Sequence, residues 1–304
     1  MAKVGLWLRG ARGKYAGGVL QKGVSGGTIV RENVAPSNPK SAGQSAQRMK
    51  MAPAQQFYLA FSSILDHSFE AVQYGVKSRW YFLSKALKSS PVAYEKGMTG
   101  FVPCEYAVSE GSLPSTVYTA FDSTDCILYT SGRLLTSEEI SYLGEADTRT
   151  RGQILPILRA YLGFDEDFNG QLTFLWVNTN SQGYKPQVAR VIFDGEDDER
   201  TLQQAISDGD AIDDLLSFCI DTLDLDIMES EHFTCVNNWG GIASACIISK
   251  FTDNKWRRSN SIMDIEPVTK ALFYSDAAVK AARESYQNKA VSELSEKYLN
   301  EGDE

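Results

Sequence analysis

Basic side chains gathered at one end of the sequence are the residues that most directly indicate a chemistry. Residues 1–50 contain nine Lys and Arg but one acid, Glu32, which leaves 21 of the 30 basic and 38 of the 39 acidic residues for the rest. Lysine and arginine bind phosphate oxygens whatever the base sequence, so this arm predicts a polyanionic partner such as nucleic acid. The arm residues that we expect to contact it are Arg9, Arg12, Lys14, Lys22, Arg31 and Arg48.

Two clusters later in the chain place aromatic side chains beside basic ones. Aromatic rings and guanidinium groups stack on the bases of single-stranded nucleic acid. We therefore extend the predicted nucleic-acid interface to Trp256, Arg257 and Arg258. The clusters are Arg79-Trp80-Tyr81 and Lys255-Trp256-Arg257-Arg258.

Each of these features also has a purely structural interpretation. Trp80 could belong to the hydrophobic core, and the Lys255 hairpin tip could simply be solvated. The basic arm could bind the acidic body of a neighbouring copy and so build a homo-oligomer without nucleic acid. The sequence leaves these alternatives open.

A calcium-loop pattern is the sharpest metal-binding motif. Asp165-Glu-Asp167-Phe-Asn169-Gly170 places oxygen ligands at alternate positions before a glycine, as calcium loops do. The twelfth position is Trp176 instead of the usual bidentate glutamate. We interpret the segment as an ordinary acidic turn and keep a Ca²⁺ site at Asp165, Asp167 and Asn169 as the alternative.

Catalytic motifs are missing elsewhere. Gly5 and Gly10 have the spacing of a phosphate loop, but the lysine that must follow is missing. His232 and Cys235 would point to opposite faces of a strand, and no G-x-S-x-G motif occurs. We expect no enzymatic activity and no cofactor. Residues 194–231, with 14 acids and one base, predict a solvated surface, with a metal-dependent enzyme as the alternative.

The pattern of apolar residues predicts an α+β fold. Strands joined by hairpins, with helices grouped together, indicate an antiparallel, sandwich-like sheet. Thr136 and Glu139 form a capping-box pattern, and Pro53 is placed to begin a helix. The expected helices cover residues 52–67, 78–89, 154–162 and 276–299. The expected strands of the arm cover residues 4–8, 18–21 and 28–32. Two hairpins are expected, one pairing 172–177 with 188–193 and the other pairing 241–251 with 255–263.

Composition divides the chain into four segments. Residues 1–40 form a basic arm whose eight glycines separate β-prone runs. Pro36–Pro39 interrupts the chain at the end of this arm. Such an arm contains too few large apolar groups to fold alone, so we expect it to pack on something else. The later segments are a helical one (41–100), a β-rich one (101–193) and an acidic one with the second hairpin and the last helix (194–304).

Hydropathy and cysteine usage predict a protein that is not secreted by means of a signal peptide. No apolar run reaches the 18 residues or so of a membrane-spanning helix, and the first residues lack the long apolar region of a secretory signal. The five cysteines are scattered and odd in number, which favours buried free thiols in a reducing cytoplasm.

Several short motifs resemble those of a known family. They are Gly17-Gly18-Val19, Gly26-Gly27-Thr-Ile-Val-Arg31, Asn38-Pro39-Lys with Gln44, Gln47 and Arg48, and Val108-Ser-Glu-Gly-Ser-Leu-Pro114. These residues resemble a family of uncharacterised proteins of Bacteroidota and their bacteriophages. The resemblance implies a phage or mobile-element protein in the host cytoplasm or a virion. We expect a non-enzymatic protein that binds nucleic acid or virion proteins, with a purely structural virion subunit as the alternative.

Overall fold

A computed structural model describes residues 42–122, 125–143, 150–181, 183–193 and 241–286, together with short strands before residue 33 and at 233–235. The chain separates into two compact units, Met1–Ser41 and Ala42–Glu304. The architecture is mixed α+β with antiparallel sheets, as the sequence predicts. No helix among the described residues is long and apolar enough to cross a membrane.

The N-terminal unit contains one antiparallel sheet with the strand order β1-β4-β3-β2. The predicted strands at 18–21 and 28–32 are confirmed, and they pair from Gly18↔Glu32 to Lys22↔Thr28. The predicted strand at 4–8 lies outside the described residues. The strands are β1 (Ala2–Lys3), β2 (Gly13–Tyr15), β3 (Gly18–Lys22) and β4 (Thr28–Glu32).

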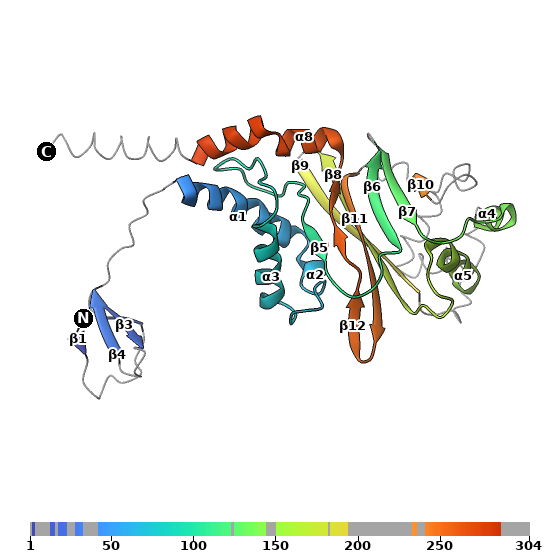
Figure 1. The fold of residues 1–304 in the computed structure, drawn as a ribbon, viewed down its shortest axis with the longest axis horizontal. Coiled ribbons are helices and arrows are strands. Elements are labelled where there is room, and N and C mark those ends of the chain that lie inside the picture. Colours follow the sequence, from blue (N-terminus) through green and yellow to red (C-terminus); the bar gives the residue numbers. More distant parts are fainter. Residues whose placement is uncertain are drawn as a thin grey trace. The chain divides into compact units, whose positions relative to one another are not determined.

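The larger unit is built on a central sheet that curls into a half-barrel (Figure 1). Its strands follow the order β12-β11-β8-β9, and a short strand, β14 (Asp264–Ile265), pairs with the start of β11. The longer strands are β8 (Gly170–Asn180), β9 (Gly183–Ile192), β11 (Gly241–Thr252) and β12 (Lys255–Arg258). The predicted segments 101–193 and 194–304 therefore share one sheet.

Both predicted hairpins are present. β8 and β9 pair along their whole length, from Gln171↔Ile192 to Asn180↔Gly183. Asp253 and Asn254 join β11 to β12 with φ angles of 53° and 59°, the left-handed conformation that a two-residue hairpin turn requires. The second hairpin is shorter than predicted, because β12 ends at Arg258. The chain then leaves β11, and Ser261–Ile262 pair with a different strand, β5 (Ala107–Ser109).

The central sheet is buried on both faces. Successive residues of a strand point to opposite sides, so β8 contributes Leu172 and Phe174 to one core and Leu175 and Val177 to another. β11 is buried continuously from Ala243 to Ser249 for the same reason. Burial on both faces explains why the sequence of β11 shows an apolar run instead of alternation.

Helices α1 to α3 cover one face of the sheet. α1 (Ala42–Ala60) is followed by α2 (Ser62–Leu65) and α3 (Val76–Ala86), and stacked aromatic rings such as Phe57 and Phe82 fill the core between them. The expected helix start at Pro53 was wrong, because Pro53 lies inside α1. The helix extends earlier since buried residues such as Met49 continue its inner face.

Short elements complete the layer that α1 to α3 form. β5 (Ala107–Ser109) pairs with β13 (Ser261–Ile262). α8 (Pro267–Tyr274) follows β14, and residues 276–286 continue as a helix, which confirms the described part of the predicted helix at 276–299.

A second sheet and helix α5 (Arg151–Leu162) contribute to the other core, and a short helix, α4 (Ser137–Leu143), precedes α5 in the sequence. β6 (Val117–Asp122) and β7 (Asp125–Thr130) form a hairpin that β10 (Phe233–Cys235) joins. The capping box before α4 is confirmed: the Thr136 amide donates to Glu139 Oε2 at 2.9 Å. α5 contributes Ile154, Leu155 and Leu158 to the core.

Buried cysteines agree with the sequence prediction where they are described. Cys104, Cys126 and Cys246 are free and buried. Burial raises the pKa of the Cys104 thiol well above its usual range, so this side chain stays protonated and unreactive.

Gly170 marks the closest approach between the turn after α5 and the central sheet. A Cβ atom at this position would collide with the Ser249 carbonyl oxygen on β11 and the Phe168 ring. The neighbouring Arg159 guanidinium fixes the turn by donating to the carbonyl oxygens of Phe168 and Phe193 at 3.0 and 2.8 Å. The glycine is therefore required for packing against β11.

Gly170→Ala should lower the free energy of unfolding by about 1 to 3 kcal/mol, the usual cost of overpacking, because the backbone of β8 must move away from β11. Gly43→Ala is the matched control, since a Cβ there meets nothing within 4 Å. Urea unfolding of the two variants measures the difference. Equal effects at both positions would contradict the packing explanation.

Candidate functional site

One face of the central sheet changes from apolar to polar along β8 and β11. On the side of α1 to α3, Leu175 and Ile247 are buried aliphatic residues. Gln171, Thr173 and Ser249 continue the same face of the two strands, and they line a cavity instead of packing on helices. The helical layer therefore ends before the sheet does.

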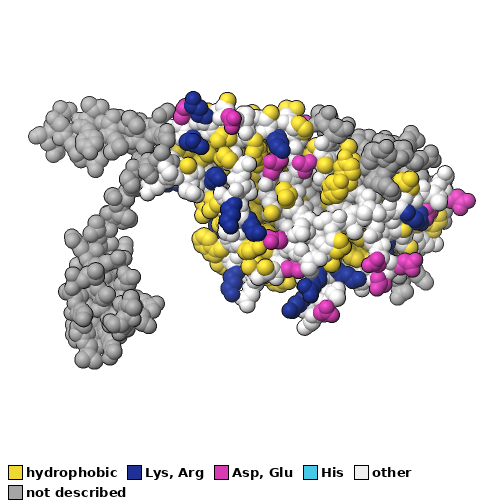
Figure 2. Space-filling model, in the orientation of Figure 1, with side chains coloured by type: hydrophobic (Ala, Val, Ile, Leu, Met, Phe, Trp, Pro, Cys, Tyr) yellow, Lys and Arg dark blue, Asp and Glu magenta, His cyan; other side chains and the backbone are white. Residues whose placement is uncertain are grey.

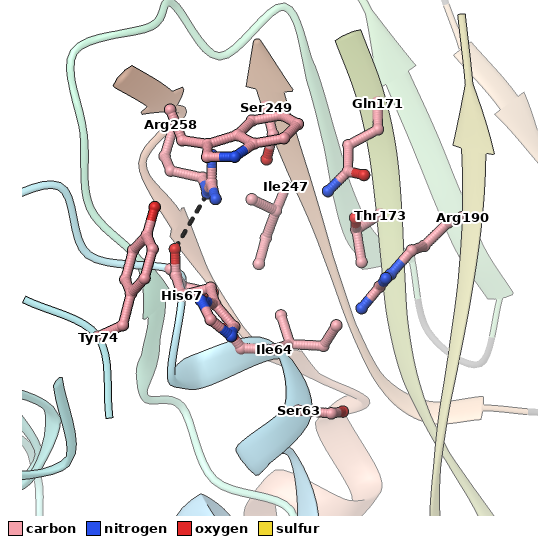
Figure 3. Close-up of a pocket in the computed structure, with 12 residues that line it drawn as sticks. Ser63, Ile64, His67, Tyr74, Gln171, Thr173, Arg190, Ile247, Ser249 and Arg258 are labelled. Carbon is pink, nitrogen blue, oxygen red and sulfur yellow. Dashed lines mark hydrogen bonds between the residues drawn. The ribbon is translucent and has the colours of Figure 1, made fainter. Parts of the chain in front are cut away.

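The cavity at this end of the sheet has a volume of about 310 Å³. This volume lies at the lower end of the range for small-ligand sites, roughly 300 to 1,000 Å³. Side chains from α2, the loop after it, and all four long strands converge on it (Figure 3). The lining residues that can hold a charge or stack on a ring are His67, Tyr74, Arg190, Trp256 and Arg258.

Strand register explains why two arginines meet here. Arg258 on β12 lies opposite Ser249 on β11, and Ser249 lies opposite Gln171 on β8. In the next row, Thr173 on β8 lies opposite Arg190 on β9. The two outer strands in the order β12-β11-β8-β9 thus bring Arg258 (β12) and Arg190 (β9) to the cavity from opposite sides.

Arg258 is a buried guanidinium without a carboxylate partner among the described residues. Only 7% of the residue is exposed. Its Nε donates to the His67 carbonyl oxygen at 3.2 Å, and Nη1 donates to the Arg257 carbonyl oxygen at 3.1 Å. The guanidinium also lies 4.9 Å from the centre of the Trp256 ring. Burial lowers the pKa of Arg258 from its ordinary value, and a bound anion would offset the cost of this buried charge.

The other polar groups of the cavity point into it. Figure 3 shows Arg190 and Gln171 reaching in from the sheet, with His67 and Tyr74 on the opposite side. Within the described part of the chain, no hydrogen bond or ion pair engages the guanidinium of Arg190. The His67 and Tyr74 rings pack edge to face, 4.5 Å apart. Donors without protein acceptors are therefore available to an acceptor-rich ligand.

A second hollow of about 610 Å³ adjoins the first. The two share His67, Tyr74, Trp256 and Arg258, which form a common wall. The second hollow adds an exposed ring, Phe251, whose side chain packs edge to face on Trp256, with 5.4 Å between ring centres. Figure 2 shows Lys and Arg side chains gathered over this end of the β11–β12 hairpin.

Glu70 fixes β12 in place. Its carboxylate accepts from the backbone amides of Arg258 and Ser112, and it lies 3.7 Å from Nη1 of Arg257. Burial opposes ionisation of this group, but the donated hydrogen bonds and Arg257 outweigh it and lower the pKa of Glu70. The one acid of the second hollow is thus already occupied by protein donors.

The turn at Val108–Pro114 packs directly on β12. The Leu113 amide donates to the Arg258 carbonyl oxygen at 2.8 Å. A Cβ at Gly111 would collide with the same carbonyl oxygen and with the Glu70 carboxylate. Glycine is needed here because the backbone must approach β12 closely.

The sequence-predicted binding residues fall into two groups. Trp256, Arg257 and Arg258 line the hollows, although Arg257 pairs with Glu70 and borders only the second. Five of the six predicted arm residues belong to the separate N-terminal unit, whereas Arg48 lies in the larger unit, exposed on α1. Arg9 and Arg12 lie outside the described residues; Lys14, Lys22 and Arg31 lie on β2, β3 and β4.

The first basic–aromatic cluster lies apart from the hollows. Trp80 is 62% exposed on α3, so the interpretation of Trp80 as a core residue was wrong. Arg79 lies 5.8 Å from the centre of the Tyr58 ring, and the Tyr81 hydroxyl donates to Glu110. Two of its three side chains therefore have structural partners.

The predicted calcium loop is an exposed turn between α5 and β8. Asp165, Asp167 and Asn169 are exposed, while Phe168 between them is buried. Among the described residues, no group of three or more His, Cys, Asp or Glu side chains is arranged to hold a metal ion. The acidic segment at 194–231 lies outside the described residues.

His67, Tyr74 and Arg190 are the site residues that the sequence did not reveal. His67 and Tyr74 lie in the loop between α2 and α3, Arg190 lies on β9, and no motif links them. The charge of Arg190 inside an otherwise apolar predicted strand, 188–193, was the one available signal. Comparison of the chain with protein-family models, with curated proteins and with solved structures finds no match.

Glu70→Gln should lower the free energy of unfolding by about 2 kcal/mol at pH 7, since hydrogen bonds to a charged group contribute roughly that much. The folded-state pKa of Glu70 is lowered, so its contribution is complete above the unfolded pKa of about 4.5 and is lost as the pH falls further. Native and variant stabilities should therefore begin to converge as the pH falls below about 4.5, towards the lowered folded-state pKa. Urea unfolding between pH 3 and 7 measures this, and a constant difference would contradict it.

Proposed function

We propose that the protein is a non-enzymatic binding protein whose larger unit binds nucleic acid at the two adjoining hollows. The observation that carries the proposal is the buried Arg258 guanidinium, which lacks a carboxylate partner within the described residues and borders both hollows beside Trp256. Arg190 enters the same first hollow, whose described lining contains no acid. Phosphate supplies the missing negative charge, and bases supply flat partners for the rings.

The basic arm supports the same proposal from the sequence. Its Lys and Arg residues are suited to phosphate contacts that add affinity without selecting a base sequence. The resemblance of the arm to proteins of Bacteroidota and their phages favours a phage protein that meets nucleic acid in the host cytoplasm or in a virion.

Arg190→Ala should weaken binding of a fluorescent 20-nucleotide oligo(dT) by about 10-fold, because one charge-assisted phosphate contact is lost. The slope of log K against log salt should become shallower by about 0.7, the value for one phosphate on a single strand. Fluorescence anisotropy over a salt series measures both quantities.

Arg283→Ala is the control for Arg190→Ala. Arg283 is also exposed, and it lies on the helical segment 276–286, outside the residues that line the hollows. Its removal changes the net charge by the same amount and should leave affinity nearly unchanged. Identical binding by the native protein and Arg190→Ala would contradict the proposal that nucleic acid binds at the hollows.

Replacing three arm residues together, Lys14→Gln, Lys22→Gln and Arg31→Gln, should also weaken oligo(dT) binding and make the salt slope shallower by up to about 2. The control is Lys77→Gln, Lys88→Gln and Lys280→Gln, three exposed residues of the larger unit. If both triple variants lose the same affinity, only the net charge matters and the arm has no specific contact.

A further inference from the structure

We infer that the two hollows hold two successive, unstacked nucleotides of a single strand, with the Trp256–Tyr74 wall between the bases and the linking phosphate at Arg258. This inference rests on the proposed function and adds the form of the ligand. It follows from three features of the site: the shared wall, the position of Arg258 and the distribution of rings.

The shared wall divides the site into two compartments. His67, Tyr74, Trp256 and Arg258 border both hollows, of about 310 and 610 Å³. Trp256 and Tyr74 remain 39% and 52% exposed, so their rings project between the compartments instead of packing into the core. Two bases that enter the two hollows are separated by this wall and cannot stack on each other.

Arg258 occupies the position that a linking phosphate must reach. A phosphodiester that joins the two nucleotides has to cross the wall, and Arg258 is the one cation that borders both sides among the described residues. Its Nε and Nη1 already bind carbonyl oxygens, which orients the guanidinium. Among the described residues no hydrogen-bond acceptor engages Nη2, so this group remains for a phosphate oxygen.

The two hollows differ in the donors and rings that they present to a base. The first hollow has Gln171 and Arg190 as donors opposite His67. The second has the exposed Phe251 ring together with Lys255 and Arg257. Ring stacking accepts any base, whereas a duplex keeps its bases paired and stacked inside. The site therefore selects single strands over duplexes without reading their sequence.

The test compares fluorescent oligo(dT) of 20 nucleotides with the same strand paired to oligo(dA), using the full chain at one salt concentration. The single strand should bind at least 10-fold more tightly. Trp256→Ala should weaken single-strand binding about 10-fold or more and leave duplex binding unchanged, since stacking on one ring is lost. Trp80→Ala removes another exposed indole, on α3 away from the hollows, and should change neither.

Competition with short ligands tests the two-nucleotide length. The dinucleotide pdTpdT should displace the labelled strand at a concentration at least 10-fold below that of thymidine 5′-monophosphate. Tyr74→Ala provides a second wall variant, since Tyr74 lies on an exposed loop and its loss spares the core. It should reduce the advantage of the dinucleotide.

The outcomes separate this inference from the function on which it rests. Binding of neither single strand nor duplex overturns both. Suppose that single strand and duplex bind equally tightly, and that Trp256→Ala binds as tightly as Trp80→Ala. This result overturns the two-nucleotide inference but leaves nucleic-acid binding standing. A strong single-strand preference that is lost in Trp256→Ala and Tyr74→Ala supports the inference.

Discussion

The pairing of β8 with β11 is the interaction on which the larger unit depends. The two strands lie side by side from Gly241↔Asn178 to Lys250↔Gly170, although more than 60 residues separate them in the sequence. Both faces of this pair are buried, so its alternate side chains contribute to two separate hydrophobic cores. Apolar burial on each side is the dominant favourable term in folding, and here one strand pair organises both cores.

The candidate site is a consequence of where that burial stops. The helical layer covers Leu175 and Ile247 but leaves the next residues of the same sheet face beside a cavity. Polar residues occupy these positions because their groups can then reach water or a ligand. Thr173, Ser249 and Arg258 are nevertheless largely buried, and backbone carbonyls hold the Arg258 guanidinium. Glu70 and the Gly111 turn fix its strand, and the Glu70 charge offsets only part of the burial that lowers the pKa of Arg258.

In the function that we propose, the hollows and the basic arm serve different purposes. The arm would supply charge that attracts any phosphate chain, and this contribution would weaken as salt rises. The hollows supply fixed donors and rings, whose positions depend on the register of four strands. Our proposal assigns affinity mainly to the arm and the preference for single strands to the hollows. Neither requires a catalytic group.

The sequence by itself determined the local features of this protein. Apolar runs separated by turn residues predicted the hairpins, the capping box predicted the start of α4, and the Trp256–Arg258 cluster indicated one wall of the candidate site. These features depend on neighbouring residues, so a single stretch of sequence contains them. Only the tertiary structure decided that β8 pairs with β11, that Arg190 and His67 join Arg258, and that Gly170 serves packing. Such contacts join distant segments through burial and register, which no local pattern encodes.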